Sequence, residues 1–252
     1  MNTRKVFILL LLQIVTFSLW AKQDTLFLAA ADAYSKGEFV KAAELYENTL
    51  NTSGESAMIY YNIGNCYYKM NKTASAILNY ERALLLNPGD KDARFNLEIA
   101  KLQTVDKIEP IDRFFLSEWI ESLQNIFGTN GWSKIGIATF LLLIGSLILF
   151  FFSRKIILKK AGFYAGIVCL VFTITCNCFA YSQKEKLIER NTAIVFAPTV
   201  TIKSSPDNSG NDLFVLHEGA KVLIKSRLGE WCEIQIADGN VGWIKNSNIE
   251  VI

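Results

Sequence analysis

The chain has 252 residues, of which 51% are hydrophobic, and its formal net charge at pH 7 is +2. The basic residues are unevenly spread: residues 23–106 hold eight Lys and Arg against eleven Asp and Glu, and residues 189–252 hold six against eight. Neither part has the basic surface that nucleic-acid binding requires, so the sequence predicts no nucleic-acid partner.

The residue types that carry most enzyme chemistry are scarce. His217 is the one histidine, which excludes an HExxH motif and any two-histidine metal site. The sequence contains neither a glycine-rich phosphate loop nor a GxSxG motif. We therefore predict that the protein is not an enzyme and has no catalytic, cofactor-binding or metal-ligating residues. A redox protein that uses Cys66 or Cys232 is the alternative, although five scattered cysteines are more typical of small hydrophobic side chains.

Residues 1–21 have the composition of a secretory signal peptide. Arg4 and Lys5 precede an apolar stretch, and Ala21 supplies a small residue at the predicted cleavage position. An uncleaved N-terminal anchor is the alternative. In both cases the segment that follows is exported.

Residues 22–106 contain an internal repeat with a period of 34 residues. Ala42 and Tyr46 lie 34 residues before Ala76 and Tyr80, and Gly37 marks a turn in the first unit. The pattern resembles the tetratricopeptide repeat, a pair of antiparallel helices that pack closely through small residues. The positions that match this pattern are predicted to be structural: Tyr60, Gly64, Tyr67, Ala76, Tyr80, Ala83 and Pro88.

This resemblance implies a concave groove that binds a protein partner. Side chains of the first helix in the stronger unit are predicted to line it: Tyr61, Asn62, Asn65 and Lys69. The two asparagines and the lysine resemble the polar clamp with which some members of the family bind carboxylates. Two repeats are fewer than usually fold alone, so the domain is expected to lean on a partner or on the segment that follows.

Residues 107–134 are predicted to form an amphipathic interfacial segment. Pro110 ends the preceding helix, and apolar residues then recur at helical spacing with Glu118 and Glu121 between them. Such a helix lies on a membrane surface, and Trp132 stands where an interfacial aromatic residue is expected. A helix that contacts protein is the alternative.

Two uncharged apolar runs, residues 135–152 and 161–181, are each about long enough to cross a ~30 Å hydrocarbon core. The loop of residues 153–160 between them carries four basic residues: Arg154, Lys155, Lys159 and Lys160. Short basic loops stay on the cytoplasmic side, so we predict a multi-pass protein of the bacterial inner (plasma) membrane. Both soluble domains are then periplasmic.

Residues 190–252 change to strand periodicity, with seven short β-rich runs separated by turn residues. Asp238-Gly239 predicts a hairpin. The pattern V-x-I-K-S-x-P, followed by G-E-W-C-E-I and by Gly242-Trp243-Ile244, resembles the bacterial Src-homology-3-like domain, a small all-β barrel. That resemblance implies binding to protein or to cell-wall peptide. Gly242 and Trp243 are predicted to be structural, and Trp243 to be buried. The ligand-binding candidates are Phe196, Phe214 and Trp231.

The order of the parts resembles the BatE-like membrane proteins of the Bacteroides aerotolerance (Bat) cluster. The predicted fold class is a multidomain membrane protein that combines an all-α tetratricopeptide repeat, two transmembrane helices and a small all-β Src-homology-3-like barrel. The resemblance implies a non-enzymatic scaffold with other Bat-cluster proteins as partners. A peptidoglycan sensor or anchor is the alternative function.

Overall fold

The computed structural model describes residues 25–111 and 114–252, which divide into two compact units. The first unit holds the described residues up to Leu84, together with Asp90–Ile111 and Asn191–Ile252. The second holds Leu85–Gly89 and the described residues from 114 to Arg190. The predicted signal peptide lies outside the described residues.

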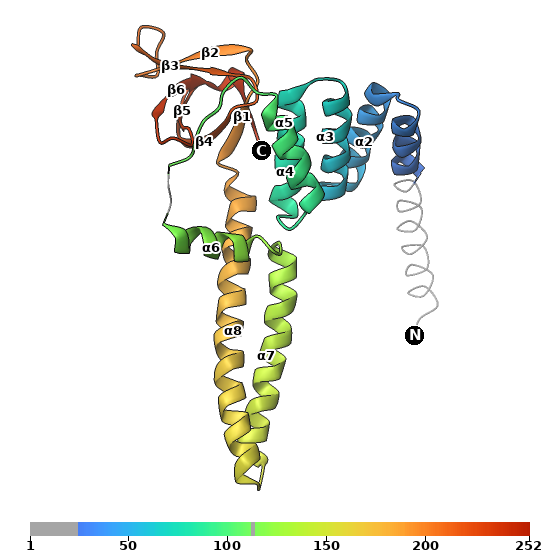
Figure 1. The fold of residues 1–252 in the computed structure, drawn as a ribbon, viewed down its shortest axis with the longest axis vertical. Coiled ribbons are helices and arrows are strands. Elements are labelled where there is room, and N and C mark those ends of the chain that lie inside the picture. The colour runs from blue at the N-terminus through green and yellow to red at the C-terminus, as the bar shows by residue number, and fades with distance from the viewer. Residues whose placement is uncertain (1–24, 112–113) are drawn as a thin grey trace, which may run out of the picture. The chain divides into compact units, whose positions relative to one another are not determined.

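The N-terminal part of the first unit is a row of helices (Figure 1). Residues 25–35 are helical, and four further helices follow: α2 (Phe39–Ser53), α3 (Ala57–Lys69), α4 (Thr73–Leu86) and α5 (Lys91–Leu102). Pro88 and Gly89 lie in the turn after α4, and Asp90 then caps α5 by accepting the backbone N–H groups of Asp92 and Ala93 at 3.1 and 3.0 Å. The predicted end of the second repeat helix coincides with this turn.

Small residues lie where these helices pack most closely. Ala42, Ala76 and Ala83 are fully buried. A Cβ atom at Gly64 of α3 would lie 2.6 Å from Cε1 of Tyr80 on α4, which is closer than carbon atoms can approach. Tyr80 is itself only 1% exposed. The glycine therefore allows the tyrosine ring to lie directly against the backbone of α3.

The C-terminal part of the first unit is a seven-stranded antiparallel sheet with the order β3-β2-β6-β5-β4-β1-β7. Its strands are β1 (Thr192–Val195), β2 (Thr199–Lys203), β3 (Asp212–His217), β4 (Lys221–Leu228), β5 (Trp231–Gln235), β6 (Val241–Lys245) and β7 (Ile249–Val251). Each predicted β-rich run contains one strand. Gly239 has a φ of +91° in the turn between β5 and β6, as the predicted hairpin requires.

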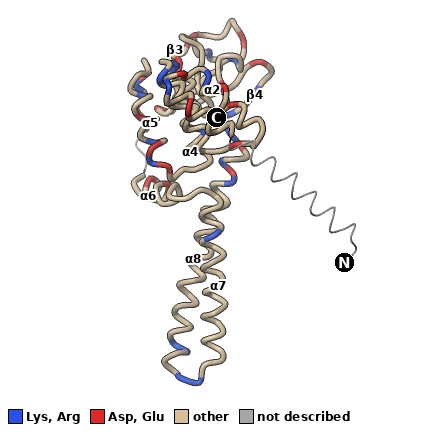
Figure 2. Tube along the Cα trace, turned by 90° about the vertical axis from the view of Figure 1, so that its right-hand side faces the viewer, with Lys and Arg blue, Asp and Glu red and all other residues tan. Residues whose placement is uncertain are grey.

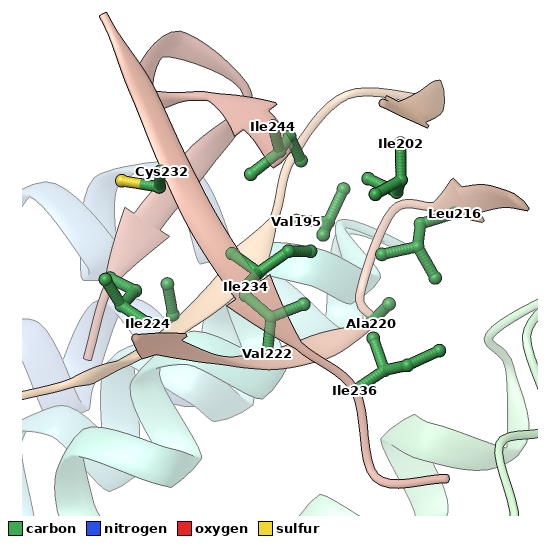
Figure 3. Close-up of a cluster of buried hydrophobic side chains, with 11 residues drawn as sticks. Val195, Ile202, Leu216, Ala220, Val222, Ile224, Cys232, Ile234, Ile236 and Ile244 are labelled. Atoms are coloured by element: carbon green, nitrogen blue, oxygen red, sulfur yellow. The ribbon is translucent and has the colours of Figure 1, made fainter. Parts of the chain in front are cut away.

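Alternating residues of the strands point into one hydrophobic core (Figure 3). In β6 the core residue is Ile244, which is completely buried. Trp243 is only half-buried and stands outside the core cluster, so the prediction that it is buried is wrong. Neighbouring residues of a strand face opposite sides of the sheet, and the buried positions Gly242 and Ile244 place Trp243 on the other side.

The sheet packs against the helices of the same unit through polar contacts. Glu81 of α4 accepts a hydrogen bond from the Lys221 ammonium at 2.6 Å. Arg82 donates to a carboxylate oxygen of Glu250 at 3.0 Å and to the Val251 carbonyl at 2.7 Å. The repeat helices thus rest on the sheet of residues 190–252, which was not expected: the sequence predicts support from a partner or from the segment of residues 107–134.

The segment after α5 also joins the sheet. Asp106 accepts the backbone N–H of His217 at 2.7 Å and lies 2.8 Å from its ring Nδ1. Ile108 packs against the hydrophobic core of the sheet, and the Ile111 N–H donates to the Ala237 carbonyl at 3.2 Å. The first residues of the segment predicted to be interfacial therefore lie on the sheet.

The second unit contains α6 (Phe115–Gln124), α7 (Thr129–Phe152) and α8 (Ile156–Glu189). α7 and α8 have mean hydropathies of 2.6 and 1.9 over their most apolar stretches, and both are long enough to cross a membrane. They form a hairpin whose turn carries basic residues, and between this end and the opposite one the two helices have no charged residue, at positions 135–152 and 161–183 (Figure 2). Gly162 lies against the backbone of α7, where a Cβ atom would be 2.8 Å from the Ser146 carbonyl oxygen. Such small residues allow apolar helices to pack closely.

Candidate functional site

The first helices of the repeat units line a groove of about 270 Å³. Three of the four residues predicted for this groove are among its lining residues: Tyr61, Asn65 and Lys69. Asn62 is half-buried and does not line it. At about 100° per residue, Asn62 lies just beyond Lys69 at the edge of the arc of α3 that faces the groove.

The groove is also lined by five residues that were not among the predicted ones: Tyr34, Tyr68, Tyr80, Asn96 and Ile99. The 34-residue period contains a signal for several of them. Tyr68 is one period after Tyr34, Ile99 is one period after Asn65, and Asn96 is one period after Asn62. Carrying the predicted groove positions forward by 34 residues finds Asn96 and Ile99, whereas Tyr34 corresponds to Tyr68, which was not predicted.

Hydrogen bonds between side chains fix the floor of the groove. Oδ1 of Asn65 accepts from the Tyr80 hydroxyl at 2.8 Å and from Nδ2 of Asn96 at 2.9 Å. The same Nδ2 lies 3.2 Å from the Tyr61 hydroxyl. Burial raises the pKa of Tyr80 above its ordinary value, so the phenol stays protonated as a donor. Asn65 therefore positions the aromatic side chains, in addition to lining the groove.

The groove has a positive character. None of its described lining residues is acidic, and Lys69 is exposed at its edge. Within the part of the chain that the structure describes, the Lys69 ammonium has no ion-pair partner. Tyrosine rings supply contact area at a low cost in conformational entropy. This arrangement suits a peptide that carries apolar or aromatic groups together with a carboxylate.

A second cavity of about 450 Å³ lies between α2, α3, α4 and the sheet. Phe196, one of the predicted ligand-binding residues, lines it together with Arg82, Glu250 and Tyr67. The Tyr67 hydroxyl donates to Glu47 at 2.7 Å. Burial, aided by this carboxylate, raises the pKa of Tyr67 to about 12. The cavity therefore combines residues from the helical repeat and from the sheet.

The other two predicted ligand-binding aromatic residues have different surroundings. Phe214 is partly buried and packs against the hydrophobic core of the sheet. Trp231 is half-buried, and the Lys245 ammonium lies 5.4 Å from the centre of its ring. Neither lines the cavity that contains Phe196. The structure does not gather the three aromatic side chains into one site.

The two cysteines considered for redox chemistry are buried. Burial raises the pKa of Cys66 to about 11 and also raises the pKa of Cys232. The thiolate is the reactive form of cysteine, so both shifts lower reactivity at neutral pH. Within the described residues, no group of three or more His, Cys, Asp or Glu side chains is placed to hold a metal ion.

Comparison with known protein families identifies a tetratricopeptide repeat at residues 57–90. The match begins at the first residue of α3 and ends at the cap of α5, so it covers the stronger of the two predicted units. None of the curated proteins compared with the chain matches it. The tetratricopeptide repeat is typically a non-enzymatic module for protein–protein interaction, and its presence in residues 57–90 is confirmed.

Proposed function

We propose that the protein is a membrane-anchored scaffold whose repeat groove binds a segment of a protein partner. The observation that carries this proposal is the groove itself, in which tyrosine rings surround a hydrogen-bonded floor beside the Lys69 ammonium. The bound segment places a carboxylate near Lys69 and apolar or aromatic groups against Tyr61 and Tyr68. Desolvated tyrosine side chains commonly supply much of the binding energy in protein interfaces.

The anchor in this proposal is the α7–α8 hairpin in the bacterial inner membrane. Its length and hydropathy support a membrane span, and the basic turn supports a cytoplasmic position for residues 153–160. The first unit then faces the periplasm. The order of the parts along the chain supports a place in a Bat-type complex for aerotolerance or stress, with other Bat-cluster proteins as partners.

The sheet of residues 190–252 supports a second candidate function. Seven short antiparallel strands around one core are compatible with a bacterial Src-homology-3-like barrel, which implies binding of peptidoglycan or protein. Phe196 is the residue that favours this reading, because it lines a cavity of about 450 Å³. Loss of murein-fragment binding in a Phe196→Ala variant that keeps its melting temperature would support the alternative.

Charge reversal in the groove tests the main proposal. Lys69→Glu should weaken capture of protein partners by the full-length protein from detergent-solubilised membranes, because it places a carboxylate where the ligand carboxylate binds. The matched control is Lys91→Glu, which reverses an exposed lysine in the first turn of α5 outside the groove. Equal capture of partners by the two variants, with equal melting temperatures, would show that the groove does not bind the partner.

A further inference from the structure

α6 has one apolar face and one polar face. At about 100° per residue, its apolar side chains fall within an arc of about 140°. These side chains are Phe115, Leu116, Trp119, Ile120 and Leu123. Glu118 and Glu121 fall on the opposite side of the helix. The apolar face is therefore continuous along the whole of α6.

Most of this apolar face is uncovered. Phe115 is 71% exposed, Trp119 is 60% exposed, and Leu116 and Ile120 are 43% and 42% exposed. Apolar residues just before and just after the helix in the sequence are also uncovered: Phe114 is 68% exposed and Ile126 is 48% exposed. Exposed aromatic and aliphatic residues in such a contiguous surface mark an interaction site.

The C-terminal end of α6 is fixed to the hairpin by buried amide groups. Nε2 of Gln124 donates to the Ser182 hydroxyl at 2.7 Å, and Nε2 of Gln183 donates to the Gln124 carbonyl at 3.0 Å. The Trp132 indole N–H donates to the same carbonyl at 2.8 Å. Gln124 and Gln183 are 8% and 3% exposed. α6 crosses the direction of α7 and α8 at this end of the hairpin (Figure 1).

The position of Gln183 along α8 indicates where in a bilayer the C-terminal end of α6 would lie. Ile156 follows the basic turn, and Gln183 is 27 residues further on, which corresponds to about 40 Å of helix. A bilayer measures ~40–45 Å including both headgroup regions. If the basic turn lies in one headgroup region, the attachment of α6 lies in the other.

We infer that α6 lies in the membrane–water interface, with Phe115, Leu116, Trp119 and Ile120 among the lipid acyl chains and Glu118 toward water. The inference rests on the proposed membrane anchor. The lipid surface is the occupant because α6 is hydrogen-bonded to the end of a hairpin whose own apolar side chains are exposed along its length. In-plane helices of this kind bind through buried apolar area, with aromatic residues at the interface.

Spin labels read by electron paramagnetic resonance test this inference in the full-length protein in lipid nanodiscs. Genetically encoded nitroxides replace Leu116 or Trp119 on the apolar face, Ser117 on the polar face, or Leu142 in α7. Molecular oxygen concentrates in the bilayer, whereas a neutral nickel chelate stays in water. Labels at 116, 119 and 142 should collide more with oxygen, and the label at 117 more with nickel.

The label in α7 separates failure of the inference from failure of the anchor. If labels at 116 and 119 respond to nickel like the label at 117 while 142 responds to oxygen, α6 stands in water and the inference is overturned. Low collision rates with both reagents at 116 and 119 would show a protein contact and would also overturn it. A nickel response at 142 would overturn the membrane anchor itself.

Discussion

Gly64 is the residue on which the packing of α3 against α4 depends. Gly64→Ala should lower the free energy of unfolding by about 1–3 kcal/mol, because overpacking a filled site forces its neighbours to move. The new Cβ would meet the Tyr80 ring at 2.6 Å, and that ring is held through its hydroxyl by Asn65. Thermal melts followed by circular dichroism measure the change.

A second substitution provides the control for Gly64. Tyr80→Leu removes the ring, so the added cost of Gly64→Ala should be smaller in that background than in the parent. An alanine variant that melts like the parent would show that the contact between Gly64 and Tyr80 is not close.

Buried thiol and phenol groups make the helical repeat sensitive to alkali. Burial raises the pKa of Cys66 to about 11 and that of Tyr46 to about 12, and Tyr67 is raised to about 12 by burial and by Glu47. The ordinary values are about 8.5 for cysteine and about 10 for tyrosine. Between these values and the folded pKa values the unfolded chain binds fewer protons, so stability falls as pH rises.

The melting temperature of the helical signal should therefore fall between pH 8 and pH 11. Cys66→Ala removes one of these groups and should make the fall smaller. At pH 7.5 the same Cys66 should resist alkylation by iodoacetamide until the protein is unfolded. Constant stability up to pH 11, or rapid alkylation of the folded protein, would contradict this assignment of the buried groups.

The asparagines show what single residues in a sequence can and cannot predict. Asn65 was predicted to line the groove, and it does, but its bonds to Tyr80 and Asn96 come from two other helices. No local pattern records such bonds, because the partners are 15 and 31 residues away. We now expect Asn65→Ala to lower both stability and binding, whereas Lys69→Glu should weaken binding and cost only the small stabilisation that a basic residue gives in the last turn of α3.

Strand β6 allows its two faces to be compared by substitution. Ile244→Ala should destabilise the sheet by about 2–5 kcal/mol, because the side chain is completely buried in the core. Trp243→Ala should cost less, since the indole is half-buried on the other side of the strand. Differential scanning calorimetry of the two variants gives the comparison. A larger loss for Trp243→Ala would place the indole in the core.

The secondary structure could be predicted closely because each element has a local pattern. Helical spacing with small residues indicated α3 and α4, and period-two alternation with turn glycines indicated the seven strands. For Trp243 the two sequence signals disagree: the motif resemblance predicts a buried tryptophan, whereas the strand alternation makes Ile244 the inward residue and agrees with the structure. The groove residues Asn96 and Ile99 of α5 lie one repeat period after predicted positions, whereas Tyr34 lies one period before Tyr68, which was not predicted to line the groove.

The joining of the repeat helices to the sheet was beyond prediction from the sequence. Asp106 and His217 are in contact but lie 111 residues apart in the sequence, and the contacting residues Glu81 and Lys221 lie 140 residues apart. Each is a single ion pair or hydrogen bond between surface-type residues, and the chain contains many other residues that could form the same kind of pair. The hydrophobic residue Ile108, between α5 and α6, likewise gives no local sign that it belongs to the core of the sheet.

For the proposed membrane anchor, the basic turn of the hairpin predicts on which side of the membrane each part of the protein lies. Activity reporters inserted near Asn51 and Asp207 should be active on the periplasmic side, and a reporter near Lys155 on the cytoplasmic side. The reason is that two spans joined by a basic loop return the chain to the side from which it came. Opposite sides for the first two reporters would contradict the hairpin.

Partner binding in the groove can be observed by site-specific photo-crosslinking in intact membranes. A benzophenone amino acid replaces Tyr68 in the groove of the full-length protein, or Val40, which is 61% exposed on α2 and lines neither cavity. We predict a protein adduct from position 68 that is absent from position 40 and is lost when Lys69→Glu is added. The same adducts from both positions, or an adduct from position 68 that persists with Lys69→Glu, would contradict partner binding in the repeat groove.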